Sequence, residues 1–297
     1  MPVIRFVFGT FLISLLSLTP CFFWAHSAHA QPDEDILHEE ALSPPGANKP
    51  DCRPSEEHPY PVILVPGTFE SMSFNWSKLS PLLAKKGYCV YALNYGITSV
   101  GFSTGPIEKS AEELKTFVDQ VLEQTGTEKV SIVGHSQGGM MPRYYIKYLG
   151  GDKKVEDLIG LAPSNHGTKG VFGIEPIMIL PGLLGCTACD QQKIGSDFLN
   201  DLNAGDETPG DVSYTVISTK YDEVVVPYTS AFLDGPSDQV SNITIQDHVP
   251  ADLAAHIGIA FDPHAFEFVY DALEHDGPAN MERAEQQWLQ KKSNHGF

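Results

Sequence analysis

A serine between glycines marks the stretch of this chain best suited to chemistry. Residues 129–134 have the pattern of a buried strand, residues 138–151 that of a helix, and "GHSQG" joins the two. At so tight a turn the serine takes a strained backbone conformation, and side chains two positions before and after it would collide with neighbouring chain. We therefore predict Ser136 as a nucleophile, with Gly134 and Gly138 leaving room for the turn.

A serine hydroxyl becomes a good nucleophile when a histidine takes its proton and a carboxylate orients that histidine. In folds with this motif the acid and then the histidine follow the serine along the chain. Asp222 ends a predicted strand and is the expected acid, with Glu223 as the alternative. His256, in the middle of the loop "AHIGI", is the expected base. His248 comes almost directly off a strand and His264 opens the last helix, so both are less suitable.

The negative oxygen that forms during acyl transfer needs backbone N–H donors. One usually comes from the residue after the nucleophile, and the other comes from the loop after the first core strand. Gln137 and Thr68 hold these positions, and the hydroxyl of Thr68 offers a further donor. Alternatively, "PGT" at residues 66–68 forms an ordinary turn without a role in binding the oxyanion.

The elements that must position these residues alternate along the chain. Strands are expected at 60–67, 88–96, 129–134, 155–163, 212–222 and 240–247, and helices at 76–87, 106–126, 138–151 and 263–274, the last as the closing helix. Such alternation predicts an α/β protein with a mostly parallel, doubly wound sheet and helices on both faces. With the serine turn added, the pattern indicates the α/β-hydrolase fold. Glycine-rich phosphate loops of the Walker or dinucleotide type are absent from the sequence.

Composition and charge narrow the class of protein. The 297 residues are 42% hydrophobic, which is enough for a sizeable core. A count of 19 basic and 38 acidic residues gives a net charge of −19, which would repel nucleic acid and anionic lipid. We expect no nucleic-acid partner. No carboxylate cluster shows a recognisable calcium spacing, so we assign no metal ligand, and the sequence leaves metal dependence open. The sequence does not predict an oligomeric state.

Residues 1–30 have the features of a secretory signal peptide. Arg5 is their only charge, an apolar run covers residues 6–24, and "AHA" supplies the small-residue cleavage site. The protein is therefore expected to be secreted, extracellular or periplasmic, without a stable membrane span after cleavage. A membrane anchor and a lipoprotein signal at Cys21 are the alternatives.

Three further segments follow. Residues 31–60 are rich in Pro and Glu without periodicity and are expected to form an extended arm. Residues 61–297 are expected to form the catalytic domain, with an insertion at about 168–205. The insertion contains more apolar side chains than a surface loop needs, namely Val171, Phe172, Ile174, Ile177, Met178, Ile179, Leu180, Leu183 and Leu184. They are expected to wall an acyl pocket or form a small lid, and packing on the core is the alternative.

Four cysteines remain after signal cleavage, an even number that predicts two disulfides in an oxidising compartment. Cys186 and Cys189 are close enough in sequence to bridge a local turn, which leaves Cys52 to pair with Cys89. A redox or zinc role for "CTAC" lacks a nearby second ligand pair or a βαβ context.

Several longer motifs resemble one known family over most of residues 52–275. These are "VILVPGTFES", "GHSQGG", "MPRYYIKYLGG", "LIGLAPSNHGT", "TKYDEVVVPY" and "HIGIAFDP", in the order and approximate spacing of the secreted class 2 triacylglycerol lipases of bacteria. The chain is more distantly similar to the yeast lipase B type. The chain departs from the family pattern at two places. It has Pro-Gly where many bacterial lipases have His-Gly, and its N-terminal arm resembles no segment of the family.

The resemblance implies an α/β-hydrolase fold, a Ser-Asp-His triad without a cofactor and Thr68 as an oxyanion donor. It also supports the Cys52–Cys89 bond. The implied substrate is a lipophilic ester such as a triacylglycerol, met at a lipid-water interface and cleaved through an acyl-enzyme. An ester also fits better than a peptide because the insertion offers no charged specificity residue. A polyester depolymerase or an acyltransferase with the same triad is the alternative, and a non-catalytic binding scaffold fits least.

Overall fold

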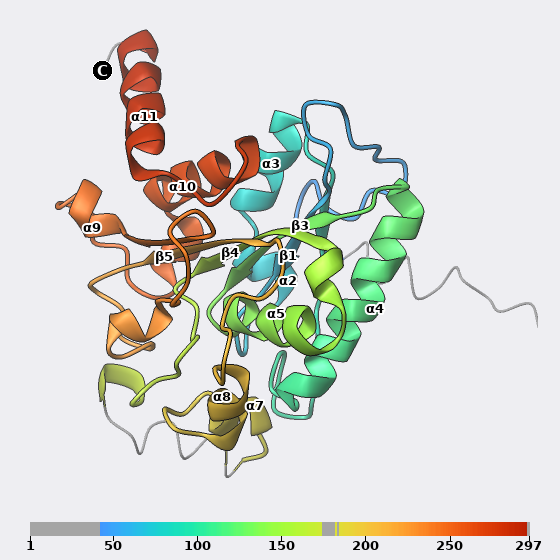
Figure 1. The fold of residues 1–297 in the computed structure, drawn as a ribbon, viewed down its shortest axis with the longest axis vertical. Helices are drawn as coiled ribbons and strands as arrows, with labels where there is room; N and C mark the ends of the chain where they lie inside the picture. Colours follow the sequence, from blue (N-terminus) through green and yellow to red (C-terminus); the bar gives the residue numbers. More distant parts are fainter. Residues whose placement is uncertain (1–41, 174–181, 183, 296–297) are drawn as a thin grey trace, which may run out of the picture.

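A six-stranded, all-parallel sheet forms the centre of the protein, with strand order β2-β1-β3-β4-β5-β6 (Figure 1). The computed structural model describes residues 42–173, 182 and 184–295. The strands are β1 (Val62–Val65), β2 (Val90–Ala92), β3 (Val130–His135), β4 (Val155–Leu161), β5 (Ser213–Ser218) and β6 (Val240–Thr244). The predicted parallel α/β sheet is confirmed. The proposed signal peptide lies outside the described residues.

Helices cover both faces of the sheet, as predicted. In Figure 1, α3 and α10 lie on one face, and α4 and α5 on the other. Alternate residues of β1 enter the two cores: Val62 and Leu64 pack with α3 and α10, whereas Ile63 and Val65 pack with α4 and α5. The helices are α2 (Met72–Asn75), α3 (Leu79–Lys86), α4 (Ile107–Thr125), α5 (Gln137–Tyr148), α7 (Thr187–Gln191), α8 (Asp197–Leu202), α9 (Ile245–His248), α10 (Pro263–Glu274) and α11 (Met281–His295). The 3-10 turns are η1 (Gly151–Lys153), η2 (Val171–Gly173), η3 (Tyr228–Ala231) and η4 (Gly258–Phe261).

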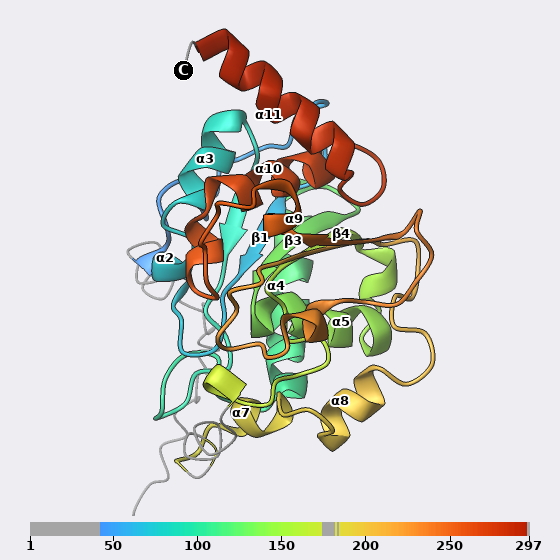
Figure 2. The same cartoon turned by 90° about the vertical axis from the view of Figure 1, so that its left-hand side faces the viewer.

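Helix ends agree with the glycine signals of the sequence, but several elements were not expected. α3 and α4 end at Gly87 and Gly126, whose left-handed φ angles of 100° and 72° suit glycine. The expectation that residues 263–274 form the closing helix was wrong, because α11 follows and lies against α10 (Figure 2). α11 is too polar to give a clear apolar stripe. The short helices α2, α7, α8 and α9 were also not predicted, because they are too short to show the hydrophobic periodicity of a helix.

The chain that precedes β1 runs along the edge strand β2. The backbone N–H of Asn48 donates to the carbonyl of Val90 at 2.9 Å, and its side chain bonds both the N–H and the carbonyl of Ala92 at 2.8 Å. A disulfide joins Cys52 to Cys89 beside this contact. These bonds satisfy backbone groups that an open sheet edge would leave unpaired. Within the described part of the chain, no helix has the length and apolar character needed to cross a membrane.

A buried carboxyl on β4 makes the stability of the fold depend on pH. Asp157 accepts a hydrogen bond from Ser131 Oγ at 2.7 Å. Burial raises the pKa of the Asp157 carboxyl to about 7, and the Ser131 hydrogen bond opposes this shift only in part. The folded protein therefore holds a proton that the unfolded chain releases at lower pH. The resulting stabilisation is complete below the ordinary pKa of 3.8 and is lost as pH rises through about 7.

Asp157→Asn is expected to stabilise the protein in a pH-dependent manner. An asparagine is neutral at every pH and its Oδ1 still accepts from Ser131. Tm should rise by about 5 °C at pH 8 and by less than about 2 °C at pH 4.5, relative to wild type at the same pH. Thermal denaturation followed by circular dichroism measures both values. Equal shifts at the two pH values would show that the Asp157 carboxyl does not titrate in this range.

Candidate active site

The turn between β3 and α5 has the strained geometry that the motif predicts. Ser136 has φ 53° and ψ −122°. A Cβ on Gly134 would lie 1.8 Å from the carbonyl oxygen of Gly138, and one on Gly138 would lie 2.1 Å from that of Val65. Only glycine fits at both positions. The turn therefore presses against the end of β1 and holds Ser136 at the carboxyl edge of the sheet.

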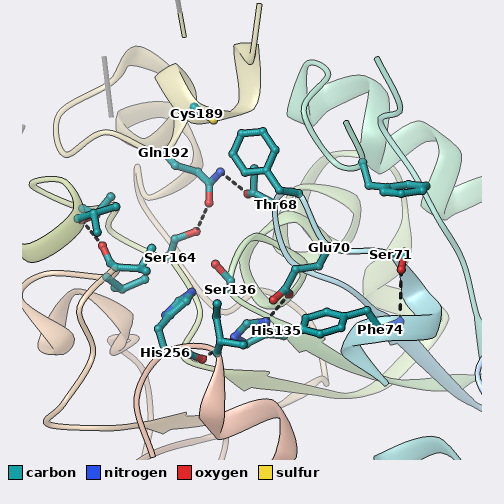
Figure 3. Close-up of a pocket in the computed structure, with 17 residues that line it drawn as sticks. Thr68, Glu70, Ser71, Phe74, His135, Ser136, Ser164, Cys189, Gln192 and His256 are labelled. Atoms are coloured by element: carbon teal, nitrogen blue, oxygen red, sulfur yellow. Dashed lines mark hydrogen bonds and ion pairs between the residues drawn. The ribbon is translucent and has the colours of Figure 1, made fainter. Parts of the chain in front are cut away.

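The structure brings Asp222 and His256 together from the loops after β5 and β6. His256 Nδ1 lies 2.9 Å from Oδ1 and 3.0 Å from Oδ2 of Asp222, and the two side chains are 5% and 2% exposed. The N–H groups of Val224 and Val225 donate to Asp222 Oδ1 at 2.9 and 2.7 Å, so the carboxylate is fixed. With Nδ1–H directed at Asp222, Nε2 of a neutral His256 remains an acceptor. Ser136 and His256 line the same cavity (Figure 3).

The alternative acid and bases lie elsewhere. Glu223 Oε2 accepts from the backbone N–H of His256 at 3.0 Å, so this carboxylate holds the main chain and not the ring. His248 Nε2 lies 2.7 Å from the sulfur of Met281, and His264 Nδ1 lies 2.6 Å from Asp252. Neither histidine lines the cavity that contains Ser136.

Thr68 and Gln137 lie beside the nucleophile from the loop after β1 and the first turn of α5. Within the described residues, nothing accepts a hydrogen bond from either backbone N–H. Their side chains contact each other: Thr68 Oγ1 donates to Gln137 Oε1 at 2.6 Å. The hydroxyl of Thr68 thus points its proton at Gln137, and the hydroxyl must rotate before it can donate to a ligand.

Gln192, which directly follows α7 in the insertion, bonds both Thr68 and Gln137. It was not identified as a site residue from the sequence. Its Nε2 shares two hydrogens among three acceptors: Thr68 Oγ1 and Gln137 Oε1, both at 3.0 Å, and the carbonyl of Ala188 at 3.1 Å. Because a carbonyl only accepts, Ala188 fixes which end of the Gln192 amide faces Gln137. Ser164 Oγ donates to the other end at 2.8 Å. α7 also contains the second disulfide, Cys186–Cys189.

A second histidine–carboxylate pair lies beneath the site. His135 Nδ1 lies 2.7 Å from Glu70 Oε2, and both side chains are almost wholly buried. Burial alone would lower the pKa of His135, but the charge and hydrogen bond of Glu70, the hydrogen bond to the His256 carbonyl and the charge of Asp222 together outweigh this, and the pKa is raised. Burial would likewise raise the pKa of Glu70, yet His135 lowers it overall. In the sequence, His135 is recognisable only as part of the serine motif.

The cavity above Ser136 has a volume of about 540 Å³ and mostly apolar walls. The apolar residues that line it are Phe69, Phe74, Phe102, Val171, Val224, Val225 and Ile257. At the rim Phe69 and Phe74 are 48% and 53% exposed. The insertion contributes Thr168, Val171, Cys189 and Gln192 to the walls. Its predicted pocket residues Ile174, Ile177, Met178, Ile179, Leu180 and Leu183 lie outside the described residues.

A group with metal-ligand chemistry lies away from this cavity. Ligand atoms of Asp252, Asp262 and His264 lie within 4.8 Å of one another, a cluster that the sequence analysis did not note. Hydrogen bonds to nearby backbone N–H groups explain the positions of the two aspartates in this cluster. Asp262 caps α10 by accepting from the N–H groups of His264 and Ala265, and Asp252 accepts from the N–H of Ala254.

A parallel sheet with a strained serine at the β3–α5 turn and an Asp–His pair at its carboxyl edge defines an α/β-hydrolase. Solved structures share this fold. Lipase B of Aspergillus fumigatus is 24% identical with a TM-score of 0.67, over 82% of this chain and 58% of that one. The mature lipase BlEst2 of Bacillus licheniformis is 16% identical with a TM-score of 0.57, over 75% of this chain and 94% of that one.

Residues 59–265 match the class 2 lipase family, and the chain belongs to that family. A triacylglycerol lipase of Pseudarthrobacter phenanthrenivorans is 39% identical over 92 residues, which cover 29% of this chain and 27% of the relative. A triacylglycerol lipase of Burkholderia plantarii is also 39% identical over 92 residues, which cover 24% of its length. The matched part thus spans about a quarter of these curated relatives.

Proposed function

We propose that the protein is a secreted serine ester hydrolase that cleaves lipophilic carboxylic esters, such as triacylglycerols, through an acyl-enzyme. One observation carries the proposal: His256, whose ring is paired with Asp222, lines the same cavity as Ser136. Membership of the class 2 lipase family supports the same reaction. The two disulfides are compatible with the oxidising compartment that a signal peptide at residues 1–30 would reach.

The reaction follows from the positions of these groups. Ser136 Oγ attacks the ester carbonyl carbon while His256 Nε2 takes its proton, and Asp222 stabilises the imidazolium. The backbone N–H groups of Thr68 and Gln137 stabilise the oxyanion. The intermediate collapses, and the alcohol leaves with the proton from His256. Water then attacks the acyl-enzyme with His256 again as base, which releases the carboxylic acid and restores Ser136.

The cavity favours an uncharged acyl chain. Its walls are largely apolar, and the carboxylate of Glu70 is paired with His135 instead of being free to bind a cationic substrate. The exposed aromatic side chains Phe69 and Phe74 at the rim suit contact with a lipid-water interface. A net charge of −19 favours neutral over anionic interfaces.

A chain-length series tests the substrate class. Turnover of p-nitrophenyl esters from acetate to palmitate, of triolein emulsion and of polyester film is compared, with Ser136→Ala as background. We expect butyrate or longer esters to exceed acetate and triolein to be cleaved. A preference for acetate alone would contradict the lipase proposal. Faster release from the polyester film would favour a depolymerase, acyl transfer to added alcohol in preference to water would favour an acyltransferase, and no turnover would favour a scaffold.

Thr68→Val is expected to lower kcat about 10- to 100-fold, because valine keeps the shape and the backbone N–H but loses the hydroxyl donor. Thr68→Ser, which keeps the hydroxyl, should stay within about threefold of wild type. Steady-state kinetics with p-nitrophenyl butyrate separates the two variants. Equal kcat for Thr68→Val and wild type would show that the hydroxyl remains with Gln137 throughout turnover.

A further inference from the structure

Three loops that carry the proposed catalytic groups meet at the buried pair formed by Glu70 and His135. Glu70 lies two residues after Thr68 in the loop that follows β1. His135 is the last residue of β3 and directly precedes Ser136. The loop that contains His256 comes from the far end of the sequence. Figure 3 shows His135 between Glu70 and the backbone oxygen of His256.

Both ring nitrogens of His135 face oxygen acceptors. Nε2 lies 2.9 Å from the carbonyl oxygen of His256, which can only accept, so Nε2 carries a hydrogen. Nδ1 lies 2.7 Å from Glu70 Oε2, a contact that requires a proton between the two atoms. The amide nitrogen of Asn75 lies farther from Nδ1, at 3.3 Å. The shorter contact shows that the proton on this side lies between His135 and Glu70. The lowered pKa of Glu70 and the raised pKa of His135 assign it to His135, which gives an imidazolium paired with a carboxylate.

We propose that Glu70 and His135 form a charged positioning pair that holds the base His256 by its backbone carbonyl. The inference rests on the proposed function, since it concerns how the base of that reaction is placed. The N–H of His256 is bound by Glu223 and its ring by Asp222. All polar groups of His256 except Nε2 are then fixed.

The same pair reaches the loop that holds the oxyanion donors. Glu70 Oε2 also lies 3.2 Å from the N–H of Gly67, the residue before Thr68, and shares this N–H with Asn75 Oδ1 at 3.0 Å. One carboxylate thus bonds the oxyanion loop and, through His135, the loop of the base. Hydrogen bonds between charged partners are stronger than neutral ones, and burial strengthens them further. The pair therefore links the loop of the oxyanion donors to the loop that contains His256.

Protonation of His135 is a condition for this arrangement. The charged groups around His135 are Glu70 and Asp222, which favour its imidazolium, and the adjacent ring of His256, whose centroid lies 4.9 Å away. The raised pKa of His135 agrees with the two donor bonds. A neutral His135 has one proton for two acceptors, so at high pH either Glu70 or the carbonyl of His256 loses its bond.

Kinetics tests the positioning role. Glu70→Gln removes the charge but keeps the size, and His135→Gln supplies a second variant in case the first folds poorly. Each is expected to lower kcat for p-nitrophenyl butyrate about 10- to 100-fold with KM within about threefold, because a small displacement of the base slows proton transfer without weakening binding. The double variant should lose no more than the more affected single variant, since the two residues act as a unit.

A matched control is the His166–Glu207 pair, which joins the same residue types at 3.0 Å away from the cavity. Glu207→Gln is expected to keep kcat within about twofold of wild type. If Glu70→Gln and His135→Gln lowered Tm while kcat stayed within about twofold, the pair would be purely structural and the inference would be overturned. If wild type showed no Ser136-dependent turnover, the proposed function would fail, and the positioning role with it.

The charge of the pair has a test that does not depend on turnover. In full-length Ser136→Ala labelled with ¹⁵N-histidine, NMR at pH 7.0 should show protons on both ring nitrogens of His135, with His135→Gln providing the assignment. Adding Glu70→Gln should remove one of these protons. A single ring proton on His135 at pH 7.0 without the Glu70 substitution would overturn the charged pair.

Discussion

Ser136→Ala is expected to lower kcat for p-nitrophenyl butyrate about 10⁶-fold, because no covalent intermediate can form without the hydroxyl. Tm should stay within about 2 °C of wild type. Alanine tolerates the φ of 53° about as well as serine does, and the described residues form no hydrogen bond with Ser136 Oγ. Steady-state kinetics and thermal denaturation on the same preparation measure both quantities.

A serine on the same strand provides the control. Ser131 lies near the opposite end of β3 and bonds Asp157, far from the cavity. Ser131→Ala is expected to keep kcat within about twofold of wild type. Residual activity of Ser136→Ala above about 1% of wild type, without contaminating esterase, would exclude Ser136 as the nucleophile.

Asp222→Asn is expected to lower kcat about 10⁴-fold. An asparagine amide no longer stabilises the imidazolium of His256 and lets the ring adopt the other tautomer, which places a hydrogen on Nε2 and prevents it from accepting the Ser136 proton. The acceptor for the N–H groups of Val224 and Val225 remains, so the loop keeps its shape. The same kinetic assay measures this loss.

Glu223→Gln is the matched control for Asp222→Asn, because the two carboxylates are adjacent in the chain. Its amide oxygen can still accept from the backbone N–H of His256, so the fall in kcat should be less than about tenfold. The reverse ranking, with Glu223→Gln as the more damaged enzyme, would reassign the acid to Glu223.

The parts of the site that sequence could predict are those governed by local rules or by chain order. The turn at Ser136 depends on Gly134 and Gly138, which lie in one short motif whose steric reason is local. Asp222 and His256 follow from the order of acid and base after the nucleophile and from their places in loops after strands. The strands were readable because β1 to β4 are mostly apolar runs, and because β5 and β6 are rich in β-branched residues and lie between turn signals.

The parts that sequence could not predict depend on distant contacts. Glu70 and His135 are 65 positions apart, and nothing in either segment shows that their side chains meet. The direction of the Thr68 hydroxyl is set by Gln192, which reaches it from 124 positions away. The sequence favours Asp222 over Glu223 by position alone, and only the structure shows that Asp222 contacts the ring of His256 whereas Glu223 contacts its backbone N–H.

Attack of Ser136 on the ester can be detected as a covalent adduct. Diethyl p-nitrophenyl phosphate leaves a stable diethyl phosphoryl group on an activated serine, which intact-mass spectrometry and peptide mapping locate. We predict one adduct per chain on Ser136, released with one equivalent of p-nitrophenol, and no adduct in Ser136→Ala. An unmodified wild-type chain, or an adduct on another residue, would contradict the account.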